Sequence, residues 1–307
     1  MRRNFSVFFF LVILLGIAGP MRLVRAEGQH DRSGNAPFDM NTLRGDVSSA
    51  LSQMDEALGP SPGDMTLEDE YYLGRAVASE ILKTYKPYTG DSALTAYLNK
   101  ICLTITVNSS KATLYSGYHV EILDTNEICA FASPGGHIFI SRGLIACASS
   151  EDALAAVIAH EVAHIQHRHV AAMLESERTV NQLTAAADRA ASMAARNLSA
   201  QEKNALLFRE SLSVSVNMLF RDGYSRDQEF EADREARLLL IGSGYDPEAL
   251  GEILGVLSQR SQPGNMSRTH PSPAERIMRL AGFQGQSGTG RSTLPLRVPR
   301  FNSALRR

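Results

Sequence analysis

Two histidines with a glutamate between them are the residues of this 307-residue chain best suited to catalysis. His160 and His164 are four positions apart, so on a helix both imidazoles leave one face and can bind one Zn²⁺ ion at about 2.0–2.1 Å. Glu161 lies about 100° around the helix axis, where its carboxylate can face a water molecule without binding the metal. The segment therefore predicts two metal ligands and a general base for a hydrolytic reaction.

The alternative interpretation is a pair of surface histidines on an amphipathic helix. Apolar residues such as Leu154, Ile158 and Ile165 surround the motif on nearly all sides, which argues against it. A helix apolar all round is buried, and histidine or glutamate without partners would be costly there. We expect this helix over about Glu151–Glu175, after a serine cap and with acids in its first turn.

A catalytic zinc site needs a third protein ligand and one open position. The candidates lie downstream in Gln228–Asp233, where Glu229 and Asp233 share a helix face and Glu231 points about 200° away from Glu229. We expect Glu229 to be the third ligand of one Zn²⁺ per chain, and Asp233 to accept the N–H of a ligating histidine. The alternative is an acidic helix face that only contacts solvent.

The elements that must position these side chains indicate a mainly helical α+β fold. Apolar spacing near 3.6 residues and capping signals predict the helices, and alternation predicts the strands. The strands should form a small antiparallel β unit beside the helix that carries the two histidines. The further elements expected are helices over 67–85, 92–108, the Ala-rich 178–220 and 226–242, one from Asp246-Pro247 and one from Ser272, and strands over 119–123, 129–132 and 137–141.

The three cysteines are few enough to leave two interpretations open. They are Cys102, Cys129 and Cys147, and an odd count leaves at least one thiol free. Export would permit a disulfide. The interpretation we favour is three small apolar side chains without a bridge.

Several segments together resemble one known family. They are similar to the zinc metallopeptidase family that includes the CAAX prenyl proteases, with HExxH and ExxxD motifs, and within it to the soluble periplasmic beta-barrel-assembly-enhancing protease branch. The resemblance covers about residues 66–283. Two departures are Cys129, where the family usually has Asn, and Ala236, where it has Gly. The segments are His160–His164, Arg168-His169, Ser225-Arg226, Glu229–Asp233, Ala130–Ile140 and Thr269–Pro271.

The resemblance implies a zincin-type domain and a zinc-dependent endopeptidase acting in protein quality control of a Gram-negative periplasm. Its implied substrates are misfolded or stalled envelope proteins, that is, unfolded outer-membrane or periplasmic polypeptides, and peripheral membrane association stays open. Substrate could add as a strand beside His137–Ser141. The alternative is a zinc-containing, chaperone-like protein that binds unfolded envelope proteins with little proteolysis. Glu161 favours the enzyme, because structural zinc does not need it.

Weaker expectations concern residues around the motif. His270, on a loop stiffened by two prolines, should lie near the metal but outside the three-ligand set, as an oxyanion stabiliser or a fourth ligand. A loop histidine bonded to backbone is an equal alternative. Arg226 could bind an oxyanion or make an ion pair at the helix start. We expect His167 and His169 to be helix-end cations or packing groups.

The two ends of the chain differ from its centre. Residues 1–26 have a positive start, a short apolar run and small residues at a cleavage site, typical of a secretory signal peptide. An inner-membrane anchor formed by residues 5–20 is the alternative. We expect a flexible linker over 27–65, the zinc metallopeptidase domain over 66–283 and a disordered basic tail over 284–307.

Net charge argues against a nucleic-acid partner. Residues 1–26 carry four Arg and no acid, so their removal changes the formal charge from −2 to −6. A mildly acidic protein is a poor general binder of nucleic acid.

Overall fold

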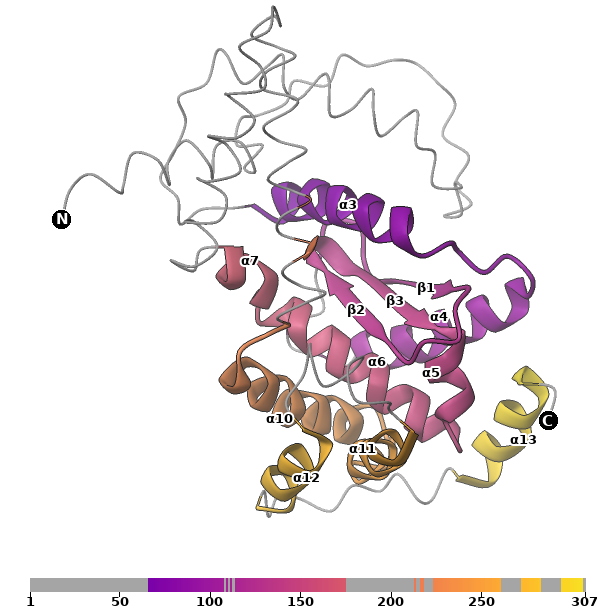
Figure 1. The fold of residues 1–307 in the computed structure, drawn as a ribbon. Coiled ribbons are helices and arrows are strands. Elements are labelled where there is room, and N and C mark those ends of the chain that lie inside the picture. The colour runs from indigo at the N-terminus through magenta and orange to yellow at the C-terminus, as the bar shows by residue number, and fades with distance from the viewer. Residues whose placement is uncertain are drawn as a thin grey trace, which may run out of the picture.

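The computed structural model describes residues 66–107, 109, 111, 114–174, 213, 216–217, 223–260, 272–282 and 294–305. The expected signal peptide, the linker, almost all of the Ala-rich region and His270 lie outside these residues. The described part confirms a mainly helical α+β fold with one small sheet (Figure 1).

The sheet has three strands in the order β1-β3-β2, formed by β1 (His119–Leu123), β2 (Ala130–Ser133) and β3 (His137–Ser141). β2 and β3 pair antiparallel across the short helix η1 (Pro134–Gly136), in which Gly135 and Gly136 have φ values of 70° and 104° that favour glycine. β1 pairs parallel with β3. The expectation of a purely antiparallel unit is therefore wrong for β1, because β3 returns between β1 and β2 rather than outside them.

Helices cover both faces of the sheet (Figure 1). On one face lies α3 (Leu67–Thr84), which packs with Phe139 of β3. On the other lie α4 (Ser92–Val107) and α6 (Glu151–Gln166), in the larger core cluster that contains Ile138 and Ile140. The alternation of β3 thus divides its side chains between two cores.

Helix α6 is buried along its whole length up to Ile165, as its apolar sequence predicts. Ser150 caps it by accepting a hydrogen bond from the Ala153 amide at 3.1 Å. It ends earlier than expected, because Arg168 adopts a φ of 55° and breaks the helix. A separate helix, α7 (His169–Leu174), follows.

Helix α10 (Arg226–Gly242) packs along α6. Its predicted capping box is present, with Ser225 and Gln228 each bonded to the other's backbone. Three more helices are α5 (Arg142–Cys147), α11 (Ala249–Arg260) and α12 (Pro273–Ala281).

The last helix, α13 (Leu294–Ala304), corrects the expectation of a disordered tail for these residues. Phe301 is 3% exposed and belongs to the main core cluster. Two arginines of the same helix form ion pairs with acids of α6. Composition alone hides this docking, because a Pro- and Arg-rich segment without acids is typical of a solvated tail.

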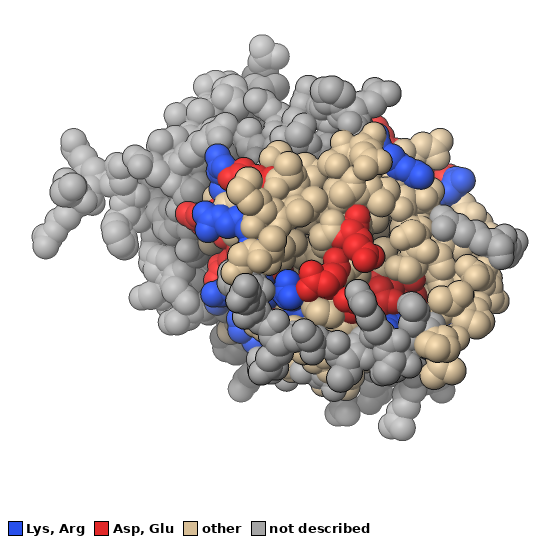
Figure 2. All heavy atoms as spheres, turned by 90° about the horizontal axis from the view of Figure 1, so that it is seen from below, with Lys and Arg blue, Asp and Glu red and all other residues tan. Residues whose placement is uncertain are grey.

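Three surface and composition findings bear on function. Among the described residues, no helix is both long and apolar enough to span a bilayer. The three cysteines are free thiols, as we favoured. Seen from below, acidic side chains gather in the middle of the described surface, with a few basic side chains beside them and others towards its edges (Figure 2).

Candidate metal centre

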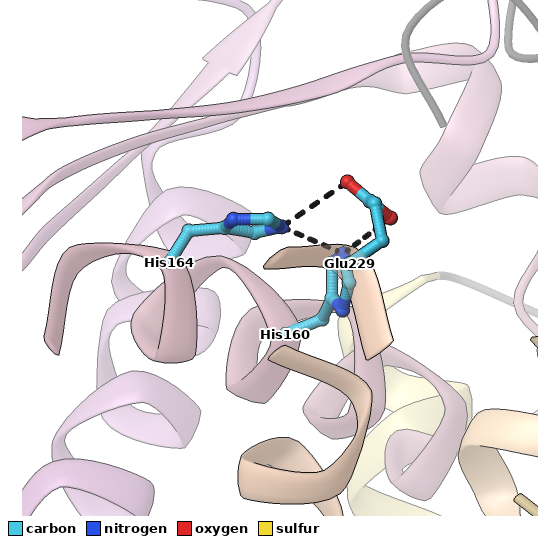
Figure 3. Close-up of side chains that lie close together, drawn as sticks. All are labelled: His160, His164 and Glu229. Carbon is cyan, nitrogen blue, oxygen red and sulfur yellow. Dashed lines mark hydrogen bonds and ion pairs between the residues drawn. The ribbon is translucent and has the colours of Figure 1, made fainter. Parts of the chain in front are cut away.

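His160 and His164 of α6 meet Glu229 of α10 in the interior (Figure 3). The two imidazole Nε2 atoms are 3.1 Å apart. Glu229 Oε1 is 3.4 Å from His164 Nε2, and its Oε2 is 3.6 Å from His160 Nε2. All three residues are buried, with at most 4% of their surface exposed. The structure thus brings together the three residues that the sequence nominates as ligands.

The spacing of these atoms fits a zinc ion. Ligands held tetrahedrally at about 2.0–2.1 Å from zinc are themselves about 3.3–3.4 Å apart. The three measured separations bracket this value, and two nitrogens with one carboxylate are a donor set that suits zinc. Glu229 begins the buried stripe of α10, and its neighbours on that face pack against α6.

Asp233 and Arg276 support the inner side of this centre. Asp233 Oδ1 lies 3.1 Å from His160 Nδ1, where it can accept the ring N–H and leave Nε2 for a metal. Arg276 of α12 donates to both oxygens of Asp233, from Nη2 at 2.6 Å and from Nε at 2.9 Å. The arginine is 2% exposed, and its Nη1 lies 3.6 Å from Glu229 Oε2. One guanidinium therefore balances two buried carboxylates.

The pKa values of the two imidazoles move in opposite directions. Burial and Arg276 act to lower the pKa of His160, but bonds to Asp233 and Glu229 outweigh them and raise it to about 9. Burial lowers the pKa of His164 to about 3. Burial alone would raise the pKa of Asp233, but Arg276 and His160 hold it well below its usual range. Asp233 is therefore an anion that can accept a hydrogen bond from the His160 Nδ1–H.

A third histidine orients His164 from the other side. His169 Nδ1 lies 2.8 Å from His164 Nδ1, and His169 Nε2 lies 3.2 Å from Glu231 Oε2. With Nε2 of His164 turned to the metal position, its Nδ1–H donates to His169, which in turn donates to Glu231. Arg168, which lies between the two histidines, has a left-handed backbone conformation. The chain turns there, so that His169 comes to lie beside His164. Of the two expectations for His169, a helix-end cation or a packing group, the second fits, because the ring is buried against His164 and Tyr224 and also positions His164.

Tyr224 and Glu161 complete the buried surroundings. The Tyr224 ring stacks on His164, with centroids 3.9 Å apart and planes 17° apart. Burial, with Glu161 and Glu229 nearby, raises the pKa of Tyr224 well above its usual value, so its hydroxyl stays a neutral donor. Glu161 is 2% exposed and lies close enough to Cys129 to contribute, after burial, to the raised pKa of that thiol.

Two other expectations have different outcomes. Arg226 forms an ion pair with Glu275 of α12, so the ion-pair interpretation holds in the structure. Strand addition beside β3 is wrong, because β3 is central and both of its edges are paired. Within the described part of the chain, β2 is an edge strand, and its Ala132 and Ser133 line a small hollow together with His164.

Sequence reasoning missed Arg276 and Tyr224, and it named His169 without its contact to His164. Arg276 shares the buried face of α12 with Leu280, four residues on, but an arginine at such a position is usually exposed. Tyr224 precedes the capping serine and carries no pattern of its own. For His169 the signal was its place three residues after the end of α6, which predicts a contact only when the helix break is known.

The fold and the site define a metal-binding domain in which an HExxH helix meets a glutamate from a second helix. The chain belongs to peptidase family M48, whose family model matches residues 92–284.

The curated relatives carry names of proteases. The beta-barrel assembly-enhancing protease of Escherichia coli (strain K12) is 27% identical over 241 residues, 76% of this chain and 48% of that protein. A putative beta-barrel assembly-enhancing protease of Vibrio cholerae is 29% identical over 217 residues, 69% of this chain and 43% of its own length. The mitochondrial metalloendopeptidase OMA1 of Schizosaccharomyces pombe is 29% identical over 240 residues, 75% of this chain and 65% of that protein. This chain spans about half the length of the two bacterial relatives.

Proposed function

We propose that this protein is a zinc-dependent endopeptidase with His160, His164 and Glu229 as metal ligands and Glu161 as general base. The observation that carries the proposal is the meeting of the three candidate ligand residues in the interior: the two Nε2 atoms are 3.1 Å apart, and each lies within 3.6 Å of an oxygen of Glu229. Membership of peptidase family M48 and the names of the relatives support it.

Each of these side chains has a different role in peptide-bond hydrolysis. Zinc would supply Lewis acidity, making a water molecule acidic near neutral pH and polarising a carbonyl oxygen. Glu161 takes the water proton on its carboxylate and delivers it to the leaving amine nitrogen. Asp233 and His169 hold the two imidazoles in the tautomers that turn Nε2 inward. The Tyr224 hydroxyl stays protonated and can donate a hydrogen bond.

The edge strand β2 offers a way to hold substrate without reading its sequence. A peptide that pairs with β2 uses main-chain hydrogen bonds, which tolerate many side chains. Such recognition suits unfolded polypeptides. By analogy with the beta-barrel assembly-enhancing proteases, we include unfolded envelope proteins among the substrates and place the enzyme in the periplasm.

Cleavage of unfolded casein by the purified full chain, with and without a chelator, tests the activity. We expect hydrolysis that the chelator abolishes and that added Zn²⁺ restores. Glu161→Gln should keep the metal and the fold but lose nearly all hydrolysis, because an amide cannot take the water proton. Turnover by this variant at the wild-type rate would overturn the mechanism. Binding of casein by both proteins without cleavage would favour the chaperone-like alternative.

A further inference from the structure

A second group of metal-binding side chains lies where α6 breaks into α7, against the outer side of α10. Glu231 bridges two imidazoles, with Oε1 3.2 Å from His167 Nδ1 and Oε2 3.2 Å from His169 Nε2. Glu235 lies one turn further along α10, with Oε2 3.5 Å from His167 Nε2. Imidazole and carboxylate groups together form a donor set that suits Zn²⁺.

The geometry of this group repeats that of the candidate centre. One donor atom from each of His167, His169 and Glu231 lies within 4.8 Å of the other two, the same relation that holds for the first three residues. The separations of 3.2 Å are close to those of tetrahedral ligands. The two groups differ in access, because the Glu231 side chain is 42% exposed whereas Glu229 is fully buried. An ion could therefore enter from solvent and keep water among its ligands.

We propose that His167, His169 and Glu231, with Glu235 beside them, bind a second divalent metal ion, for which Zn²⁺ is the probe. The inner centre offers three buried ligands, so it should fill first. The outer site should fill at higher metal concentration, because its carboxylate, that of Glu231, is partly exposed to solvent.

The hydrogen bond between His164 and His169 links the two sites. An ion on Nε2 of His164 leaves the proton of that ring on Nδ1, where it donates to His169. An ion on Nε2 of His169 places the proton of that ring on its own Nδ1. Two N–H groups would then face each other across 2.8 Å. The ions therefore weaken each other's binding, and by linkage the effect is reciprocal.

Metal counting tests the site without relying on catalysis. The full chain carrying Glu161→Gln is dialysed against rising Zn²⁺, and bound zinc per chain is measured. We expect two ions per chain, the second with lower affinity, and one ion when His167→Gln is added. Control variants carrying His119→Gln, a histidine of β1 outside both groups, should keep two. One ion at all concentrations, or two ions in the His167→Gln chain, would overturn the proposal.

A second variant guards against a folding defect in His167→Gln. Glu235→Gln should weaken the outer ion while thermal unfolding of the one-zinc protein stays unchanged. An outer affinity equal to that of the parent would count against the assignment of Glu235.

The test of this coupling rests on the proposed function, because it measures hydrolysis, whereas the metal count does not. Casein hydrolysis by the wild-type chain should fall as zinc exceeds one equivalent, because an outer ion removes the hydrogen bond by which His169 orients His164, and His167→Gln should resist this inhibition. Equal inhibition of both proteins would overturn the coupling. If neither protein hydrolyses casein at all, the proposed function fails, whereas the metal count still decides the second site.

Discussion

Arg300 of the last helix places its guanidinium on the carboxylate of Glu151, the first residue of the helix that carries both metal-site histidines. The Nε to Oε2 distance is 2.6 Å, and Glu151 is 1% exposed. Tyr97 and Tyr245 donate to the same carboxylate at 2.7 and 3.1 Å. The buried negative charge at the start of α6 is therefore balanced by a cation from α13, a helix that lies beyond the residues matched to the family.

Arg300→Ala should lower the free energy of unfolding by about 1–3 kcal/mol, because it removes the cation from a buried, hydrogen-bonded carboxylate. The measurement is the midpoint of chemical unfolding with zinc present. Asn302→Ala, an exposed change on the same helix, is the control and should have little effect. Equal midpoints for Arg300→Ala and the parent would show that α13 does not stabilise α6.

Glu229→Gln should release the inner metal ion, because a neutral amide is a poor replacement for an anionic zinc ligand. Zinc retained after dialysis of the purified protein measures the effect. Asp227→Asn is the matched control, since Asp227 is an exposed acid of the same helix. Loss of zinc from the control and not from Glu229→Gln would reassign the third ligand.

Arg276→Met should lower zinc affinity roughly 10–100-fold, the usual cost of losing support behind a metal ligand. The guanidinium holds Asp233, which in turn orients His160. Arg276→Lys should recover little, because an ammonium group cannot make both bonds to the carboxylate. Competition with a chromogenic chelator gives the affinities, with Arg279→Met as the control on the same helix. Full recovery by lysine would mean that charge alone matters.

His137 should make the fold sensitive to acid. Burial, His119 and Arg75 lower its pKa to about 4 from 6.5. Between pH 6.5 and 4 the unfolded chain binds a proton that the folded chain does not, so stability is lost as the pH falls through this window. The expected loss is on the order of 2–3 kcal/mol. His137→Phe should remove this part of the pH dependence in unfolding experiments, and an unchanged slope would contradict the assignment.

The sequence predicts the helices and strands that have strong local patterns. Ser150 and Ser225 mark helix starts, and the apolar residues around His160 predict burial, because each signal depends on neighbours within one or two turns. The parallel pairing of β1 with β3 was missed, since strand order depends on a return path that local alternation does not encode. The docking of α13 was missed for a similar reason, because it depends on acids about 150 residues away.

The candidate site likewise contains residues that the sequence predicts and residues that it does not. The spacing within α6 and α10 nominates His160, His164, Glu229 and Asp233, because those residues share helix faces. The partners that orient them could not be found so easily. Arg276 arrives from a separate helix, and His169 makes its contact only because the chain turns at one residue.

That turn places two opposed demands on position 168. Its left-handed backbone favours glycine, and a residue with a side chain costs of order 1 kcal/mol or more there. Yet the Arg168 side chain forms an ion pair with Glu70, an acid of α3 that is 6% exposed. Glycine would relax the backbone and take this cation away, whereas lysine would keep a charge and the strain. Few substitutions can satisfy both demands, so this position should tolerate little variation for reasons of backbone and charge alone.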